Sequence, residues 1–183
     1  MDVAFGAEVP EDHDDPKPSF DGPEQVLDES VQHKATVTTS GGQISLRLFS
    51  GESPVTANSF AFLAQQGFYD ATVIHRVVPG FVIQMGDPTG TGTGGPGYKF
   101  ADELAAARNR GYKRGTLAMA NAGRDTNGSQ FFICLGEVGL PPQYAVFGEV
   151  AEGMDVVDRI AGVPLAGESP RQTVFVEKVT FDG

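Results

Sequence analysis

Short apolar runs, broken by glycine and proline, follow one another from Lys34 to the end of the chain. In residues 44–48 apolar side chains alternate with polar ones, and the turn residues 40–42 separate this run from an apolar run at 35–39. Such alternation around a short turn predicts a β-hairpin that buries one face. Similar runs predict further strands at residues 72–78, 81–85, 116–120, 130–134, 144–150 and 173–181.

Two other segments carry helical signals. We predict a first helix over residues 55–66, because Ser53 and Pro54 form a cap and first-turn pair and Gly67 suits the helix end. A second, short helix is predicted from residue 153 or 154 to 160, where the apolar residues form one stripe. Many short strands with only two helices favour a barrel or a sandwich, and the pattern does not choose between them.

Residues 1–31 differ from the rest, because prolines at positions 10, 16, 18 and 23 stand among many acidic side chains. This composition predicts an acidic, extended tail, followed by one domain over residues 32–183. With 40% hydrophobic residues, the chain can bury one substantial core. Such tails often link a domain to a signal or anchor. We therefore expect a cytoplasmic protein as the sequence stands, and an extracytoplasmic one if the tail follows a removed signal or anchor.

The formal net charge of -11 argues against nucleic-acid partners, since phosphates would be repelled and the chain has no basic stripe. No apolar stretch approaches the ~20 residues that a membrane-spanning helix needs. Cys134 is the single cysteine, so it has no partner for an internal disulfide, and its apolar neighbours predict a buried core residue. We expect polypeptide partners and a monomeric protein.

The most informative chemistry surrounds the Pro-Gly turn at residues 79–80, where two strand-like runs meet. Arg76 before the turn and Gln84 after it could share one face of a hairpin, next to Phe81. A second run supplies another amide, Asn121, and two further aromatic residues. A permanent cation beside amides and aromatic rings suits a site that grips a peptide rather than one that cuts it.

These runs resemble the cyclophilins, a family of peptidyl-prolyl cis/trans isomerases, from about Lys34 to Gly183. The resemblance implies a mainly β fold, a closed eight-stranded antiparallel β-barrel with a helix over each end. It also implies isomerase activity on proline-containing peptides and on unfolded or client proteins, with no cofactor and no metal. The motifs that carry it are residues 75–87, FYD at 68–70, GTGG at 92–95, FADE at 100–103, MANAG at 119–123, SQFFI at 129–133 and VFGEV at 146–150.

Rotation about an X-Pro bond faces a barrier of ~18 to 20 kcal/mol, because the nitrogen lone pair is delocalised into the carbonyl. In the twisted amide the nitrogen regains its lone pair, so a hydrogen-bond donor placed there lowers the barrier without covalent chemistry. Arg76 is the expected catalytic donor, since arginine is always charged and its planar fork is easily fixed. The expected substrate-binding residues are Phe81, Val82, Gln84, Ala120, Asn121, Ala122, Gln130, Phe132, Leu140 and Tyr144.

The chain also departs from the family pattern. It has no tryptophan, and Gly139 aligns with the place where many cyclophilins carry one beside the site. In the family this tryptophan helps to bind cyclosporin, so we expect weak cyclosporin binding. Tyr144 stands where a histidine is common and Val82 where a methionine is common. Both substitutions keep apolar contact area, so they should alter preference more than mechanism.

The sequence raises three other interpretations. A module that binds proline segments with little turnover remains the main rival. A nucleotide site at the glycine-rich residues 92–97 lacks a following Lys-Ser/Thr pair and a convincing helix. A hydrolytic triad is disfavoured, because Ser129 lacks the nucleophile elbow and His75, next to Arg76, should point to the opposite face. The X-Pro bonds of the tail raise the further hypothesis that the tail occupies its own or a neighbour's site.

Overall fold

The computed structural model describes all 183 residues. One curled antiparallel sheet of nine strands dominates it, in the order β3–β11–β1–β2–β8–β6–β7–β5–β4, and a two-stranded sheet pairs β9 with β10. The strands are β1 (His33–Thr39), β2 (Gly42–Leu48), β3 (Thr72–Val73), β4 (Arg76–Val78), β5 (Val82–Met85), β6 (Thr116–Met119), β7 (Phe131–Cys134), β8 (Val146–Glu152), β9 (Leu165–Ala166), β10 (Ser169–Pro170) and β11 (Phe175–Asp182).

The mainly β prediction is confirmed, but the closed eight-stranded barrel is not: the nine-stranded ladder is open. Its edge strands, β3 and β4, follow each other in the chain and do not pair. The residues between them bond elsewhere, since the Ile74 N–H donates to the Val174 carbonyl at 2.9 Å. The free edge of β4 meets the turn before β10, where the Val77 N–H donates to the Glu168 carbonyl at 2.7 Å. The predicted strand over residues 72–78 is therefore split in two.

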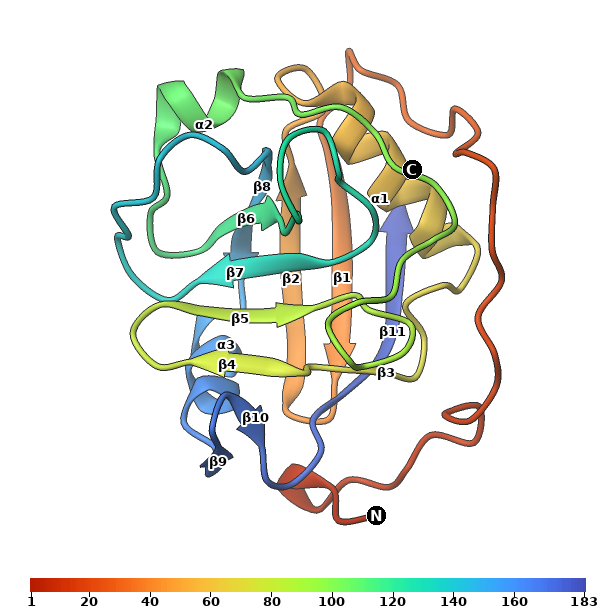
Figure 1. Ribbon diagram of the computed structural model, residues 1–183, viewed down its shortest axis with the longest axis vertical. Helices are drawn as coiled ribbons and strands as arrows, with labels where there is room; N and C mark the ends of the chain where they lie inside the picture. Colours follow the sequence, from red (N-terminus) through yellow and green to blue (C-terminus); the bar gives the residue numbers. More distant parts are fainter.

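The helices are α1 (Pro54–Gln65), α2 (Ala105–Arg110) and α3 (Met154–Ala161), with a short 3-10 helix η1 (Ala4–Gly6). Both predicted helices are confirmed, whereas α2 was missed. In Figure 1, α1 lies at the upper right end of the curled sheet and α3 at the lower left. Ser53 does not cap α1, because its hydroxyl donates to the Val146 carbonyl. The distant carboxylate of Glu103 accepts from the Thr56 N–H instead, at 2.6 Å.

The main core lies inside the curl of the sheet and gathers 32 buried residues, mostly from the strands, α1 and α3, with Ala4 and Leu27 from the N-terminal segment. In Figure 1, β4, β5 and β7 cross in front of β1 and β2, and the core fills the space between these two layers. Phe60 of α1 meets Phe131 of β7 edge-on at 5.4 Å between ring centroids. None of the helices is both long and apolar enough to cross a bilayer.

Residues 1–31, which we call the strap, run along the surface past α1, on the right of Figure 1. Apart from η1 and turns they form no regular helix, and most of their side chains are exposed. Several contacts nevertheless fasten them to the domain, among them the packing of the His13 ring against Phe175. Ala4 is buried, and its backbone N–H donates to the carbonyl of Thr173, which lies just before β11. Phe20 packs edge-on against Phe62, and Leu27 is buried.

Candidate active site

The predicted site residues lie on the outer face of β4, β5 and β7 and in the loops next to it. Alternation along β5 sends Ile83 into the main core and leaves Gln84 outside, half-buried. The sheet register pairs Arg76 with Gln84, and Gln84 with Phe132. The hairpin prediction, in which Arg76 and Gln84 share one face, is therefore confirmed.

A chain of side-chain hydrogen bonds fixes the arginine. The Arg76 Nε–H donates to the Glu168 carboxylate, and Nη1 donates to Gln84 Oε1 at 3.2 Å. Gln84 Nε2 in turn donates to Gln130 Oε1 at 3.0 Å, and Gln130 Nε2 donates to the Gly94 carbonyl at 3.0 Å. Because Nη2 makes no hydrogen bond within the protein, part of the guanidinium fork remains available to a ligand.

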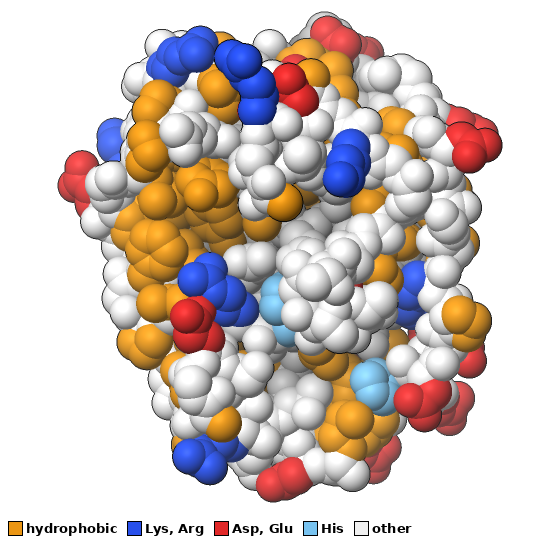
Figure 2. All heavy atoms as spheres, viewed as in Figure 1, with side chains coloured by type: hydrophobic (Ala, Val, Ile, Leu, Met, Phe, Trp, Pro, Cys, Tyr) orange, Lys and Arg blue, Asp and Glu red, His pale blue; other side chains and the backbone are white.

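An apolar slot lies beside the arginine on the same face. Val82 of β5 and Phe132 of β7 belong to a second cluster of nine buried residues, on the outer face of the sheet. Phe81, Leu140 and Tyr144 are partly buried and pack against that cluster, with the Tyr144 ring edge-on to Phe132 at 5.7 Å. Figure 2 shows a partly hollowed hydrophobic patch on the left of the molecule, over β6 and β7. An apolar surface of this kind can hold an apolar ring of a ligand.

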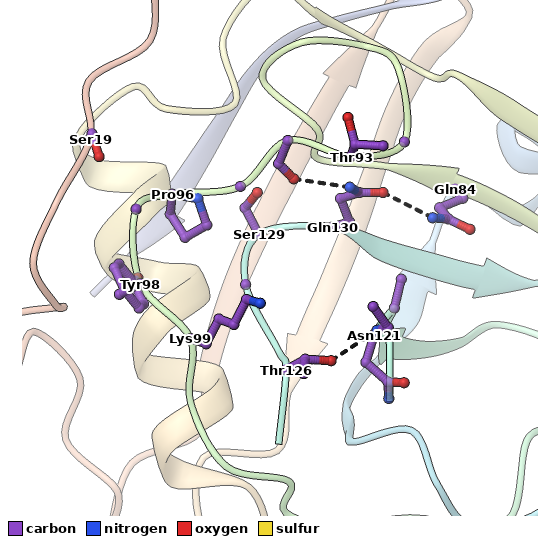
Figure 3. Close-up of a pocket in the computed structure, with 17 residues that line it drawn as sticks. Ser19, Gln84, Thr93, Pro96, Tyr98, Lys99, Asn121, Thr126, Ser129 and Gln130 are labelled. Atoms are coloured by element: carbon purple, nitrogen blue, oxygen red, sulfur yellow. Dashed lines mark hydrogen bonds between the residues drawn. The ribbon is translucent and has the colours of Figure 1, made fainter. Parts of the chain in front are cut away.

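A polar cavity of about 900 Å³ opens on the other side of Gln84. The predicted residues Gln84, Ala120, Asn121, Ala122 and Gln130 line it, and Figure 3 shows Gln84 and Gln130 linked along one wall. Asn121 holds the neighbouring loops: its Nδ2 donates to the Gln143 carbonyl at 2.9 Å and its Oδ1 accepts from the Gly123 N–H at 3.2 Å. The cavity therefore offers fixed amide groups next to the apolar slot.

The glycine-rich segment 92–97 forms another wall of this cavity. The buried carboxylate of Asp87 accepts hydrogen bonds from the backbone of Gly92 at 2.5 Å and Gly94 at 3.2 Å. Burial raises the pKa of Asp87, but hydrogen bonds from Thr89, Gly94 and Gly92 outweigh it and leave the pKa below its usual value. A carboxylate thus already occupies the backbone donors that a phosphate would need, which argues against a nucleotide site.

The remaining reactive side chains are poor nucleophiles. Cys134 is fully buried, as predicted, and burial raises its pKa to about 12, so the thiol stays protonated. Ser129 is 1% exposed and its hydroxyl donates to the Gly86 carbonyl. His75 is half-buried, and burial lowers its pKa although the nearby charge of Asp87 acts in the opposite direction. The site can therefore bind and polarise a peptide without attacking it.

Four neighbours of the site escaped the sequence analysis. Glu168 orients Arg76 from 92 residues away, and Tyr112 fixes Tyr144, whose carbonyl accepts from the Tyr112 hydroxyl at 2.7 Å. Lys99 and Ser19 line the polar cavity. No local sequence pattern marks any of the four, because each lies in a loop that only the tertiary fold brings next to the site. The FADE motif at 100–103 was the nearest signal to Lys99.

Comparison with known proteins agrees with this geometry. The family model described as "Cyclophilin type peptidyl-prolyl cis-trans isomerase/CLD" matches residues 34–181. A relative from Mycobacterium tuberculosis, "Probable peptidyl-prolyl cis-trans isomerase B", is 45% identical over 176 residues, covering 86% of this chain but only 57% of its own length. The chain thus spans little more than half of that relative. A Helicobacter pylori "Peptidyl-prolyl cis-trans isomerase" is 44% identical, covering 91% of this chain and 96% of the relative.

Solved structures give the same answer. A cyclophilin type peptidyl-prolyl cis-trans isomerase from Cryptosporidium parvum superposes with a TM-score of 0.79 at 31% identity, covering 84% of this chain and 99% of the other. A second crystal structure of that protein, in the presence of the dipeptide Ala-Pro, gives a TM-score of 0.78 at 32% identity, covering 82% and 99%. The nine-stranded sheet, its capping helices and the matched residues show that this chain belongs to the cyclophilin-type peptidyl-prolyl cis-trans isomerase family.

Proposed function

We propose that this protein accelerates cis/trans rotation about X-Pro bonds in peptides and folding proteins, without a covalent intermediate. One observation carries the proposal: the Arg76 guanidinium is held rigidly beside an apolar slot, with its Nη2 group unpaired. Family membership and the Ala-Pro dipeptide present with the Cryptosporidium parvum relative support the substrate class.

The mechanism follows from electrostatics. The apolar slot formed around Val82 and Phe132 holds the proline ring, while the segment on the other side of the bond rotates. As the amide twists, its nitrogen gains a lone pair, and the Arg76 fork donates to that nitrogen. Gln84 and Glu168 keep the fork oriented before the substrate arrives, so little reorganisation is needed in the transition state. No proton is transferred in this scheme.

The test compares the catalysed cis-to-trans rate of a short Ala-Pro peptide for the wild type and Arg76→Ala. Loss of one preorganised donor should lower kcat/KM by about 10² to 10³. Arg47→Ala is the matched control, since Arg47 is also a surface arginine paired with a glutamate, Glu149, at 2.7 Å. Equal rates for wild type and Arg76→Ala would remove Arg76 from the mechanism. An inactive wild type that still binds the peptide would indicate a proline-recognition module instead.

We extend the proposal to inhibition by cyclosporin, which we expect to be weak. The chain contains no tryptophan, and Gly139 has nothing within 4 Å of where a side chain would begin. Gly139→Trp would add a large apolar surface beside the slot, so the inhibition constant should fall by about tenfold or more, as burying an aromatic side chain contributes on the order of 1.5 to 3 kcal/mol. Nanomolar inhibition of the unaltered protein would contradict this expectation.

A further inference from the structure

The strap reaches the substrate site, although it lies far from Arg76 along the chain. Ser19 lines the polar cavity together with Gln84 and Gln130, and Figure 3 shows its side chain at the cavity edge opposite Gln84. The next residue, Phe20, donates its backbone N–H to the Pro96 carbonyl at 2.8 Å. The strap therefore touches both the cavity and the glycine-rich wall of that cavity.

The contact with this wall is close. Gly97 has a positive φ of +98°, and a Cβ there would collide with the Ser19 hydroxyl and lie 2.6 Å from the Phe20 carbonyl oxygen. The wall consequently passes against the strap with no room for a side chain. Gly97 serves two purposes here: it permits the left-handed backbone conformation and it permits this approach.

The strap is anchored independently of the cavity. The Phe20 ring packs edge-on against Phe62 of α1 at 5.1 Å. Farther along, the buried side chain of Asn58 accepts from the Val26 and Leu27 N–H groups at 2.8 and 3.1 Å and donates to the Glu24 carbonyl at 2.9 Å. The ring contact and these hydrogen bonds fasten the strap to α1 on the two sides of residues 21–23. A segment held this way can act as a fixed support for a neighbouring loop.

Three supports together hold the segment 92–97. Asp87 binds the Gly92 and Gly94 N–H groups from within, and Gln130 binds the Gly94 carbonyl from the sheet. The strap binds the far end, at Pro96. Gln130 also bonds to Gln84, which in turn bonds to Arg76. Gln130 therefore links residues 92–97 to the arginine through hydrogen bonds.

We propose that the strap is part of the substrate site: Ser19 contributes to the cavity wall, and Phe20 holds residues 92–97 in the position that receives peptide residues flanking the X-Pro pair. This inference rests on the proposed function and deepens it. The strap lies beside the site rather than across it, since none of its hydrogen bonds reaches Arg76, Gln84 or Asn121. Peptides long enough to reach the cavity should sense the strap, whereas minimal Ala-Pro peptides should not.

A thiol-protection experiment on the full chain tests the contact directly. Ser19→Cys introduces an exposed thiol, while the natural Cys134 is fully buried with a pKa of about 12 and should not compete. A peptide with an Ala-Pro core and three residues on each side, at ten times its Kd, should slow the modification by about tenfold. The short Ala-Pro peptide at the same saturation should give no protection. Val9→Cys, in the strap but 40% exposed and away from the cavity, is the control and should stay unprotected.

Kinetics with point variants tests the support. Phe20→Ala removes the ring that packs against Phe62, so the Phe20 backbone N–H is no longer held firmly against the Pro96 carbonyl. KM for the long peptide should rise by about three- to tenfold, the range for one weakened hydrogen-bonding contact, and should rise more than KM for the short peptide. Phe20→Leu, which keeps an apolar anchor against Phe62, should recover most of the long-peptide KM. Thermal unfolding confirms that each variant is folded.

The outcomes separate this inference from the function on which it rests. Protection by the long peptide without turnover would keep the strap in the binding site and reject the isomerase. Turnover without protection, or equal losses for long and short peptides in Phe20→Ala, would reduce the strap to a stabilising segment and overturn the inference. If the wild type neither binds nor turns over either peptide, both proposals fall.

Discussion

The two faces of β5 and β7 are built from the same strands and do different work. Inward residues such as Ile83 and Phe131 are fully buried in the main core of 32 residues. Outward residues such as Gln84 and Phe132 meet Arg76 and the apolar slot. Because side chains alternate along a strand, neighbours in sequence are divided between stability and binding. Phe131 and Phe132 are thus adjacent aromatic residues, and we expect substitution of Phe131 to affect mainly stability and substitution of Phe132 to affect mainly activity.

The largest effect should come from this pair. Phe131 is 0% exposed and contacts Phe60, Tyr69 and Phe147 edge-on. Phe131→Ala should lower the free energy of unfolding by about 3 to 5 kcal/mol, because it leaves a cavity in a closed aromatic cluster. Chemical denaturation measures this loss. On the protein that remains folded, kcat/KM should change little.

Phe132→Ala should show the reverse balance. Its ring is 5% exposed and packs against Tyr144, which itself borders the slot, so neighbouring side chains and solvent can fill part of the gap. We expect a smaller loss of unfolding free energy than for Phe131→Ala, and a fall in kcat/KM of about tenfold or more from the lost apolar contact with proline. Equal stability losses and equal activity losses for the two variants would remove the division between the faces.

A smaller effect should follow from breaking the amide chain on the outer face. Gln84→Leu removes the acceptor for Arg76 Nη1 and the donor to Gln130 Oε1, so kcat/KM should fall by about tenfold, as expected for one hydrogen bond to a charged group. Gln84→Glu keeps the acceptor but loses the donor. If orientation of Arg76 is what matters, its rate should lie between those of the wild type and Gln84→Leu. A Gln84→Glu rate at or below that of Gln84→Leu would place the importance in the Gln130 bond.

The alternation also explains what the sequence could predict. Residues 81–85 and 130–134 are apolar on nearly every position, because one face fills the core and the other forms the slot, so period alone could not separate core from site. The family motifs supplied that division, and the structure places Arg76, Phe81, Val82, Gln84, Phe132, Leu140 and Tyr144 on one face.

Features set by the tertiary path of the chain were beyond reach. The open ladder depends on where residues 74–77 find partners, namely Val174 and Glu168, about a hundred residues downstream. The helix α2 was missed because it spans only six residues and has no side-chain cap. The docking of the acidic strap depends on a few buried contacts, such as Leu27 and Asn58, within an otherwise polar composition. The composition of the strap predicts a polar, extended segment and does not show which residues it contacts.

The smallest effect concerns the pH dependence of stability and involves His75, which lies between the buried Ile74 and the site residue Arg76. Burial is the main cause that lowers its pKa below 6.5; the charge of Asp87 opposes this shift and the charge of Arg76 adds to it. The buried Nδ1 has no hydrogen-bond partner. The neutral form is therefore favoured in the folded protein, and the unfolded chain binds a proton first as the pH falls.

The free energy of unfolding should accordingly decrease as the pH falls below about 6.5, the pKa of histidine in the unfolded chain. His75→Phe keeps a ring but does not titrate, so its unfolding free energy should be flatter between about pH 7 and pH 5 than that of the wild type. The depressed pKa of Asp87 acts in the same direction at lower pH, since its carboxylate loses its hydrogen bonds to Gly92 and Gly94 only when protonated. The two contributions therefore occupy separate windows. If His75→Phe and the wild type lose stability in parallel from pH 7 to 5, His75 does not contribute to this pH dependence, and the loss of stability in acid comes from the carboxylates alone.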